Sequence, residues 1–542
     1  MWRTEKLQEK RTRSFNVKWY LNITREEFKE LYPTGDISLF EREPESDEDF
    51  IANFLPNKLW RLNNIYTIID KDGNKLRFNM NHAQHRAYSS MLRHPRVIIL
   101  KSRQQGISTF MLINYFDDGI FIEDLNIGML AQGLEEASTL LERVKTAWEN
   151  FPPAIKDFLG VVVVKDNSKE YSFSNGSKIF IRTSFRSATL QRLHVSEMGK
   201  IANKDPQKAK ELISGTMQAI KAGNPVVVES TAEGRKNQFY KMWYRAADFV
   251  GERGLKDFKP LFLSWVYDPD CVADIPQRAT TEDQAYIDKV ERDLDVKLTD
   301  RQKWWVVVQR RESGEDFDQE YPYDPESAFE AVRDGAYYAR LWKPLRTKHI
   351  IDGLYDAALP VRVAIDLGMN DTMVLVYYQV HINLNGEKEL RVIDVYYNSG
   401  EGLKHYVEQM RSTNYAIEKV ILPHDVKVKE LGTSKSRLAI LRELGVRKTL
   451  VIPRTSSVSN DIELVRRAIP SLYIDADCSY IDDMLHNYSK QWDDKMGVWK
   501  DKPLHDEWSN PADAVRYMVI AEHSSGKSAK PAKMRKPRGI AL

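Results

Sequence analysis

The chain has 542 residues, of which 42% are hydrophobic and 29% charged, a composition typical of a globular protein in water. This length exceeds one ordinary hydrophobic core, so we expect two large domains with smaller additions. The 80 basic and 78 acidic residues leave a net charge of only +2, which excludes a uniformly positive surface; any nucleic-acid binding must come from local basic patches.

Residues 1–60 form an N-terminal extension in which charged and aromatic residues mix without a motif that indicates chemistry. The first residues, MWRTEKLQEKRTR, are charged and no apolar segment follows them, so no signal peptide is predicted. No run in the sequence approaches the roughly 20 apolar residues that span a bilayer. We therefore expect a cytoplasmic protein without a membrane partner.

Residues 61–265 alternate short β-rich runs with helix-like stretches, the pattern of a parallel sheet with crossover helices. The runs are RVIILK, NIGMLAQ, KIFIRT, RLHVS and PVVVEST, and GLEEASTLLERVKTAWENF is helix-like. This order predicts an α/β nucleotide-binding domain, and the family resemblance described below implies that it is a P-loop ATPase of the RecA-like (ASCE) type.

The segment KSRQQGIST, residues 101–109, joins a predicted strand to a predicted helix. In a phosphate-binding loop the main-chain N–H groups converge on phosphate, and a hydroxyl holds Mg²⁺. Gly106 would supply the turn and Ser108 the metal-binding hydroxyl. The residues expected to bind nucleotide in this segment are Ser102, Arg103, Gln104, Gln105, Gly106, Ile107, Ser108 and Thr109.

The loop lacks its usual lysine, because Ile107 occupies that position. Arg103 or Lys101 would have to return the positive charge from the other side of the loop. An ordinary strand-to-helix turn is the alternative interpretation of the segment.

Other polar residues favour the nucleotide interpretation by their order along the domain. Glu197 ends the apolar run LQRLHVS and is a candidate to orient or deprotonate the attacking water. Ser196 precedes it, where an aspartate is usual. Ser230 and Thr231 end the run PVVVEST and are candidates to sense the γ-phosphate, and Gln84 is a candidate to bind the adenine edge.

Residues 266–350 are helical and strongly charged, so we expect a small helical linker subdomain. Cys271 lies here, and the chain's other cysteine is Cys478. Neither belongs to a metal-binding or redox spacing, which excludes a disulfide framework and a zinc ribbon.

Residues 351–523 open a second β-rich region whose order suits a ribonuclease-H-like nuclease domain. Asp366 lies in the apolar run VAID, where a carboxylate is costly to bury unless it is paired or bound to a metal. Asp425 follows the run VILPH, and Asp513 starts a predicted helix. Carboxylates from separate elements can hold two metal ions for phosphodiester cleavage. The alternatives are a turn at Asp425 and a helix cap at Asp513.

Residues 524–542 have six basic and no acidic residues, with Ser, Gly and Pro in place of an apolar period. They predict a basic flexible tail, which would bind DNA or a protein partner or remain a solvated end.

Taken together, these motifs resemble those of the large terminase subunit of tailed bacteriophages, the motor that packages DNA into proheads and cuts it. The similarity runs from about Gln84 to Tyr517. SRQQGIST is similar to the family's deviant Walker A, LHVSE to a Walker B, ESTAEG to the coupling motif, and FDQEYPYDPESAFEA to the segment after the ATPase core. IDLGMNDT, PHD and NPADAVRY resemble its three acidic nuclease motifs.

The resemblance implies roles for individual residues. Arg103 would replace the loop lysine, Glu197 would be the catalytic carboxylate, and Arg186, with Arg182 as its rival, would act across a subunit interface. Asp366, Asp425 and Asp513 would be catalytic and bind Mg²⁺ or Mn²⁺, while Ser108 would bind the Mg²⁺ of ATP.

The resemblance also implies partners: double-stranded DNA, the portal protein and prohead, a small terminase subunit, and copies of this chain in a ring, a pentamer by family resemblance. It would act in the host cytoplasm, docked transiently on the prohead. Two other classes remain open: an ATP-dependent helicase-nuclease of DNA repair, and a nuclease whose α/β half is a non-hydrolysing scaffold.

Overall fold

The computed structural model describes residues 21–70, 73–185, 189–330, 335–368, 372–428, 435–454, 457–493, 496 and 498–525. The chain divides into two compact units, Met1–Ala331 and Val332–Leu542, and each is described by itself. Arg186 and nearly all of the predicted tail lie outside the described residues. Within the described ranges, no helix has the length and apolar character needed to cross a bilayer.

The first unit is built on an eight-stranded sheet in the order β10-β3-β9-β8-β4-β7-β6-β5. Neighbouring strands from β10 to β7 are parallel, and β6 and β5 continue the sheet antiparallel. The strands are β3 (Arg96–Lys101), β4 (Asn126–Leu130), β5 (Val163–Asn167), β6 (Glu170–Phe173), β7 (Lys178–Arg182), β8 (Arg192–Ser196), β9 (Val226–Ser230) and β10 (Lys259–Leu263).

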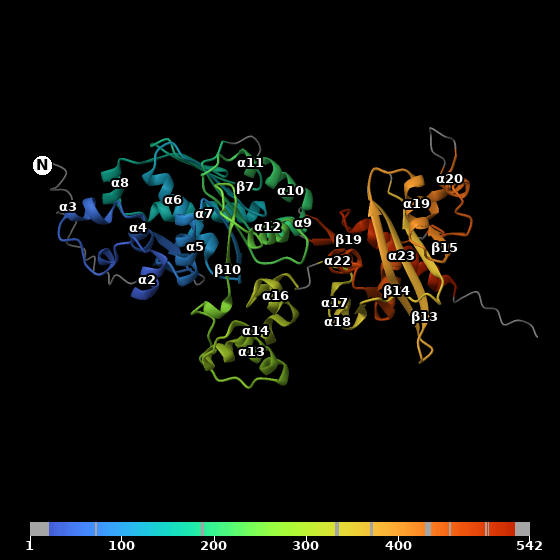
Figure 1. Ribbon diagram of the computed structural model, residues 1–542. Coiled ribbons are helices and arrows are strands. Elements are labelled where there is room, and N and C mark those ends of the chain that lie inside the picture. The colour runs from blue at the N-terminus through green and yellow to red at the C-terminus, as the bar shows by residue number, and fades with distance from the viewer. Residues whose placement is uncertain are drawn as a thin grey trace, which may run out of the picture. The chain divides into compact units, whose positions relative to one another are not determined.

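Helices cover both faces of this sheet (Figure 1). Successive side chains of a strand point to opposite faces, so Val97 and Ile99 of β3 join one core while Ile98 and Leu100 join the other. The helices are α5 (His82–Arg93), α6 (Ile107–Phe121), α7 (Leu134–Glu149) and α8 (Pro153–Leu159) with the first core, and α9 (Met198–Lys204), α10 (Pro206–Glu211), α11 (Met217–Ala219) and α12 (Gln238–Ala247) with the second. The predicted α/β class and parallel sheet are confirmed.

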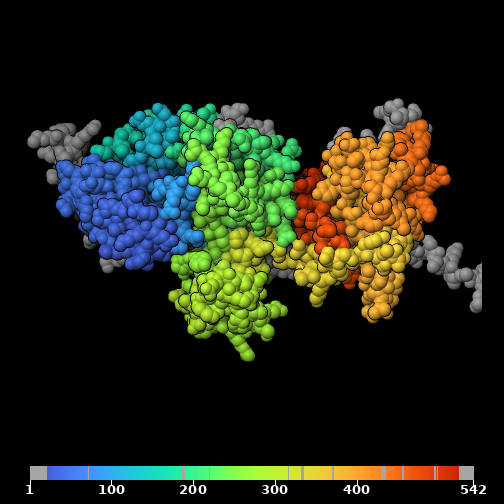
Figure 2. Space-filling model, in the orientation of Figure 1, coloured from blue at the N-terminus to red at the C-terminus, as the bar shows by residue number. Residues whose placement is uncertain are grey.

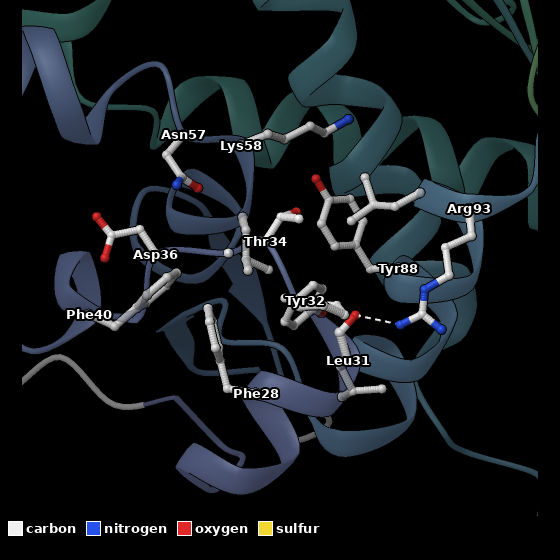
Figure 3. Close-up of a pocket in the computed structure, with 14 residues that line it drawn as sticks. Phe28, Leu31, Tyr32, Thr34, Asp36, Phe40, Asn57, Lys58, Tyr88 and Arg93 are labelled. Atoms are coloured by element: carbon white, nitrogen blue, oxygen red, sulfur yellow. Dashed lines mark hydrogen bonds between the residues drawn. The ribbon is translucent and has the colours of Figure 1, made fainter.

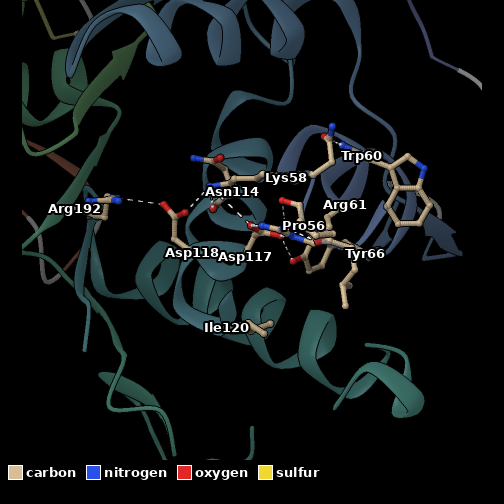
Figure 4. A network of polar contacts seen from close by, with 12 residues as sticks. Pro56, Lys58, Trp60, Arg61, Tyr66, Asn114, Asp117, Asp118, Ile120 and Arg192 are labelled. Atoms are coloured by element: carbon tan, nitrogen blue, oxygen red, sulfur yellow. Dashed lines mark hydrogen bonds and ion pairs between the residues drawn. The ribbon is translucent and has the colours of Figure 1, made fainter. Parts of the chain in front are cut away.

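The N-terminal residues pack on the first core. Their elements are α2 (Arg25–Leu31), α3 (Asp47–Asp49), α4 (Lys58–Asn64), β1 (Thr67–Ile69) and β2 (Lys75–Arg77). Figure 4 shows how α4 holds the end of α6: Arg61 pairs with buried Asp117 through two bonds of 2.8 and 2.7 Å, and Lys58 reaches Asp118 at 2.7 Å. Arg192 at the start of β8 also binds Asp118, at 3.2 Å. The helix that follows the predicted phosphate loop is therefore fixed at its far end.

Residues 265–330 form a helical group with a small core of its own, which includes Trp265, Ile287, Val306 and Phe317. Figures 1 and 2 show α13 and α14 of this group projecting from the first unit. Its helices are the short 3₁₀-helix η4 (Trp265–Tyr267), α13 (Thr281–Leu294), α14 (Asp300–Ser313), α15 (Phe317–Glu320) and α16 (Pro325–Phe329). The division between the units falls inside the range 266–350 that was expected as one linker.

The second unit contains a seven-stranded sheet in the order β11-β17-β14-β13-β12-β15-β16. Strand β13 is antiparallel to β12 and β14, whereas β12, β15 and β16 are parallel. The strands are β11 (Ile350–Ile351), β12 (Val361–Asp366), β13 (Met373–Ile382), β14 (Lys388–Asn398), β15 (Ile417–Leu422), β16 (Thr449–Val451) and β17 (Leu472–Asp475), and a separate hairpin pairs β18 (Lys490–Asp493) with β19 (Val498–Pro503). The central order β14-β13-β12-β15-β16 is the ribonuclease-H-like arrangement that the sequence predicts.

Helices also cover both faces of the second sheet. The helices are α17 (Ala339–Trp342), α18 (Arg346–His349), α21 (Val458–Ala468), α22 (Ser479–Asn487) and α23 (Ser509–Ser525) on one face, and α19 (Leu403–Ser412) and α20 (Arg437–Glu443) on the other. Ala364 of β12 belongs to the core with α23, while Val363 and Ile365 belong to the opposite core. Because strand side chains alternate, Asp366 shares the α23 face with Ala364.

Candidate functional site

The predicted nucleotide site lies at the carboxyl edge of the first sheet. Strands β3, β9 and β8 are adjacent and parallel, so their C-terminal ends meet there. Lys101 ends β3, Ser230 ends β9 and Ser196 ends β8. Ligands of α/β sheets bind outside this edge, which makes it the right place for the candidate residues to gather.

The loop between β3 and α6 turns through left-handed backbone at Gln104 (φ 67°) and Gly106 (φ 68°). A Cβ at Gly106 would come within 2.6 Å of Gln84 Nε2, so a larger residue there would strain the backbone and displace the Gln84 amide. Among the described side chains none caps the first turn of α6, which leaves its N–H groups and positive dipole end directed toward the loop. This arrangement suits phosphate.

Gln84 braces the loop. Its Nε2 donates to the carbonyl of Gly106 at 2.9 Å, and its Oε1 accepts from the N–H of Asn81 at 2.9 Å within the cap of α5. Both ends of the amide make hydrogen bonds within the protein, and the contact of Gln84 with adenine stays a prediction.

Several loop residues bind the segments that follow the sheet. The N–H of Ser102 donates to the Leu263 carbonyl at 2.9 Å, and Gln105 Nε2 donates to the Ser264 carbonyl at 3.3 Å. Arg103 donates its N–H to the Glu320 carbonyl at 2.7 Å and forms a 3.2 Å ion pair with the Glu320 carboxylate. The Arg103 side chain is 56% exposed, so in this structure it faces the helical group instead of the sheet edge.

Lys101 occupies the centre of the sheet edge. Its ammonium lies 3.1 Å from Glu197 Oε1 and 3.3 Å from Glu229 Oε2, and its side chain is 7% exposed. The sequence offered two cations in place of the loop lysine. Lys101 lies beside the other candidate residues at the sheet edge, whereas Arg103 pairs with Glu320. Ile107 is buried in the core.

Glu229 is the functional candidate that the sequence interpretation missed. It is fully buried near the end of β9 and accepts hydrogen bonds from Ser108 Oγ at 2.6 Å and from Ser196 Oγ at 2.8 Å. A carboxylate within the apolar run VVVES is the same signal that singled out Asp366, and it would have found this residue.

The carboxylate of Glu229 stays ionised in spite of its burial. Burial alone would raise its pKa, but the charge of Lys101 and the hydrogen bonds that it accepts hold the pKa of Glu229 below its usual value. Burial would likewise lower the pKa of Lys101, and the charges of Glu197 and Glu229 raise it instead. Lys101 therefore lies between two carboxylates, Glu197 and Glu229, in one charged group at the sheet edge.

Glu197 adopts a left-handed backbone conformation (φ 55°, ψ 47°) at the start of α9. Such strain in a non-glycine residue is typical of functional sites, where it fixes the direction of a side chain. Its Oε2 is buried without a hydrogen bond, 3.7 Å from Lys200.

Ser230 connects the end of β9 to the turn that carries Glu197. Its Oγ accepts from the Gly199 N–H at 2.9 Å, and a Cβ on Gly199 would come within 2.8 Å of that oxygen. The buried Thr231 hydroxyl makes no hydrogen bond within the described residues. Farther along this loop, Arg235 pairs with Glu330 at the end of α16.

The remaining loop hydroxyl and the candidate arginines lie apart from this group. Thr109 Oγ1 accepts from Arg143 of α7 at 3.4 Å. Arg182 at the end of β7 stacks its guanidinium over Phe180, 4.8 Å from the ring centroid. Arg186 is outside the described residues.

The donors at this edge fit a divalent cation with a triphosphate. The Ser108 hydroxyl donates its proton to Glu229, which leaves its lone pairs for a cation. The carboxylate and hydroxyl oxygens are donors of the kind that Mg²⁺ prefers, and the N-terminus of α6 supplies N–H groups for phosphate.

A second candidate site lies at the carboxyl edge of the second sheet. β12 and β15 are adjacent and parallel, with Ala364 beside Ile421, so Asp366 and Asp425 follow at the same edge. Asp425 lies in the 3₁₀-helix η6 (His424–Lys427), and its Oδ1 is buried without a hydrogen bond.

Asp513 faces this edge from α23. The helix begins at Ser509, so Asp513 lies inside it and the alternative that it only caps the helix is wrong. Asn510 donates to the Thr372 carbonyl at 2.9 Å, which ties the start of α23 to the segment between β12 and β13. Burial raises the pKa of Tyr517 in the next turn of α23, and the charges of Asp513 and Asp366 raise it further.

Asp513 also forms a 3.0 Å ion pair with Arg516, while burial raises the pKa of Asp513. No group of three or more His, Cys, Asp or Glu side chains within the described ranges is positioned to hold a metal ion. The hard oxygen donors are of the type that Mg²⁺ and Mn²⁺ prefer, but closer approach of Asp366, Asp425 and Asp513 would be required.

One cavity of about 520 Å³ lies in the N-terminal part of the first unit (Figure 3). Tyr32, Phe28, Phe40 and Tyr88 line it, and Arg93 closes one side by donating to the Leu31 carbonyl at 2.8 Å. None of the predicted site residues lines this cavity.

No protein-family model and no curated protein matches the chain. Among solved structures, the large terminase of bacteriophage HK97 matches with 10% identity and a TM-score of 0.41, over 86% of this chain and 99% of that one. The large terminase of a thermophilic bacteriophage, in complex with ADP, matches with 15% identity and a TM-score of 0.27, over 80% and 96%. The nuclease domain of the bacteriophage SPP1 large terminase, with bound Mn, matches with 19% identity and a TM-score of 0.26, over 32% and 95%.

Proposed function

We propose that this chain is a large terminase subunit, which uses ATP to move double-stranded DNA into a prohead and cuts that DNA with a metal-dependent nuclease. The observation that carries the proposal is the buried group of Lys101, Glu197 and Glu229 beneath the uncapped start of α6. A ribonuclease-H-like unit in the same chain supports the cutting activity.

In the proposed ATPase, the triphosphate lies against the loop 102–109 and the first turn of α6. Lys101 contacts the phosphates, and Glu197 orients and deprotonates the attacking water. Mg²⁺, when bound through Ser108, stabilises the charge that develops on the phosphate oxygens. The geometry favours Lys101 over Arg103 for the phosphate contact.

An arginine from a neighbouring copy in a ring, Arg186 or Arg182, completes the proposed site. Arginines that act in this way contribute about 10³ or more in rate in other phosphate-loop enzymes. The proposal also includes a pentameric ring, binding to the portal and to a small subunit, and action in the host cytoplasm. These parts rest on the family resemblance alone.

Hydrolysis is coupled to DNA movement through the loop after β9. The hydrogen bond from the Gly199 N–H to Ser230 joins the turn of Glu197 to that loop, and the pair of Arg235 and Glu330 joins the loop to α16. A shift at Glu197 on loss of the γ-phosphate is thereby passed to the helical group.

In the proposed nuclease, Asp366, Asp425 and Asp513 hold Mg²⁺ or Mn²⁺. A metal held by these carboxylates would supply an activated water and charge stabilisation for the leaving oxygen. Asp513 exchanges its pairing with Arg516 for the metal.

The decisive experiment incubates the full chain with ATP, linear double-stranded DNA and cognate proheads that carry their portal. DNase-protected DNA that requires ATP and proheads is the expected result, and Asp366→Asn abolishes cleavage while leaving ATP hydrolysis intact. Asp352→Asn, at an exposed aspartate of the same unit, is the control. Duplex unwinding without proheads would instead indicate the helicase-nuclease, and cleavage without any ATP hydrolysis the non-hydrolysing scaffold.

A further inference from the structure

Strand β8 lacks a carboxylate at the position where a P-loop ATPase needs one. In these enzymes the loop Ser or Thr and an acidic residue at the end of another strand of the sheet hold the Mg²⁺ of the nucleotide together. Here Ser108 is present, but Ser196 occupies the position before Glu197. The site must therefore recover a negative charge from elsewhere.

The register of the sheet supplies that charge from β9. Strands β8 and β9 are parallel, and Ser196 is the direct partner of Glu229. Side chains at directly opposite positions share one face of a sheet, and Ser196 Oγ donates to Glu229 Oε1 at 2.8 Å. The carboxylate thus lies one strand away from its usual position.

The contacts of Glu229 reproduce those that a metal-anchoring carboxylate requires. Its Oε1 also accepts from Ser108 Oγ at 2.6 Å, so both serine hydroxyls can donate to one oxygen, and the two hydroxyl oxygens lie 3.4 Å apart. A hydroxyl that donates its proton keeps its lone pairs as acceptors. Its Oε2 lies 3.3 Å from Lys101, and His194 Nε2 lies 3.4 Å from Oε1 in the fully buried interior. These four contacts fix the carboxylate from several sides.

We propose that Glu229 takes over the metal-anchoring role that is absent from β8: it orients Ser108 and Ser196 and supplies the negative charge that draws the divalent cation of the nucleotide to Ser108. Glu229 is a positioning residue, because it acts on the cation through the serine hydroxyls. This inference rests on the proposed ATPase function and deepens it.

The test uses the full-length chain and two measurements. Calorimetry measures the binding of ADP with and without Mn²⁺, and electron spin resonance measures the binding of Mn²⁺ itself. Glu229→Gln is expected to weaken ADP binding in the presence of Mn²⁺ by about 10-fold or more, the scale of losing an orienting partner of a metal ligand, with metal-free ADP affinity unchanged. Glu291→Gln, at a buried carboxylate that pairs with Lys303 at 3.0 Å in the helical group, is the matched control and should change neither value.

Restoring the carboxylate on β8 provides a rescue that a merely structural role would not give. Ser196→Asp combined with Glu229→Gln should recover most of the Mn²⁺-dependent affinity. If Glu229→Gln does not fold, Glu229→Asp tests the proposal instead, because it keeps the charge but shortens the reach to Ser108. This variant should lose the Mn²⁺-dependent affinity for ADP and keep the metal-free affinity.

The outcomes separate this inference from the function on which it rests. Wild-type-like Mn²⁺·ADP binding by the Glu229→Gln variant, or an equal loss with and without metal, overturns the role of Glu229 and leaves the ATPase proposal intact. A wild-type chain that binds no nucleotide overturns both.

Discussion

At the residue scale, the site depends on which cation faces the phosphates. Arg103 and Lys101 both flank the loop, and their neighbours separate them: Arg103 pairs with Glu320, while Lys101 lies between Glu197 and Glu229. Lysine and arginine both bind phosphate, so the direction of each side chain decides between them here.

A charge exchange tests this assignment. Arg103→Glu should impair ATP hydrolysis by repelling Glu320 and displacing the loop, and adding Glu320→Arg should restore most of the rate because the ion pair returns in reverse. Steady-state phosphate release from the two variants and the wild type gives the answer. If the double variant remains inactive although it folds, Arg103 itself contacts the nucleotide.

The buried charges also predict a pH dependence of stability. Lys101→Met leaves Glu229 without its counter-ion and should lower the free energy of unfolding by about 3–5 kcal/mol at pH 7. In the folded wild type the pKa of Glu229 is lowered, so the stability it provides is present above its unfolded pKa and is lost as the pH falls toward the folded value.

In the Lys101→Met variant the largest influence that opposes burial is lost, so the pKa of Glu229 rises and protonation at lower pH relieves the buried charge. The difference in unfolding free energy between variant and wild type should therefore shrink from pH 7 to pH 5 in urea titrations. A constant difference over this range would contradict the ionised state assigned to Glu229.

At the element scale, the strand-loop-helix from β3 to α6 requires glycine at one position for two reasons. Gly106 combines a left-handed backbone with close contact to Gln84, whereas Gly160 after α8 has a similar φ of 65° and a Cβ placed there would meet no atom within 4 Å. Gly106→Ala should lower ADP affinity and stability, while Gly160→Ala should lower stability alone, by about 1–2 kcal/mol for the backbone strain. Calorimetric ADP titration and thermal unfolding of both variants compare the two effects. If the two variants bind ADP with equal affinity, Gln84 and Gly106 do not belong to the nucleotide site.

Much of this element order is readable from the sequence. The runs RVIILK, RLHVS and PVVVES become β3, β8 and β9 almost residue for residue, because buried parallel strands are continuous β-branched runs. Strand β10 is not among the predicted runs, since KPLFL contains a proline and its pairing with β3 joins distant parts of the chain. The orientation of Arg103 is equally inaccessible from the sequence, because Glu320 lies far away along the chain.

At the scale of the whole molecule, two units with separate cores imply two ligand responses. The nucleotide site lies within Met1–Ala331, and the aspartates lie within Val332–Leu542. A ligand that binds only the folded state stabilises it by about 2.7 kcal/mol at a hundredfold excess over its Kd.

Calorimetric unfolding of the full chain should therefore show one transition that ADP raises and another that Mn²⁺ raises in the absence of nucleotide. Asp366→Asn should remove the Mn²⁺ effect and keep the ADP effect. A single transition that responds equally to both ligands would mean that the units do not unfold separately.

The central claim, that the edge of the first sheet hydrolyses ATP through Glu197, is tested most directly by single-turnover release of γ-phosphate from Mg²⁺·ATP with saturating double-stranded DNA. The wild-type chain should release phosphate, and Glu197→Gln should bind ATP with nearly unchanged affinity but release phosphate at least about 10²-fold more slowly, the scale of losing a general base. Release by Glu197→Gln at the wild-type rate would contradict the assignment of this site.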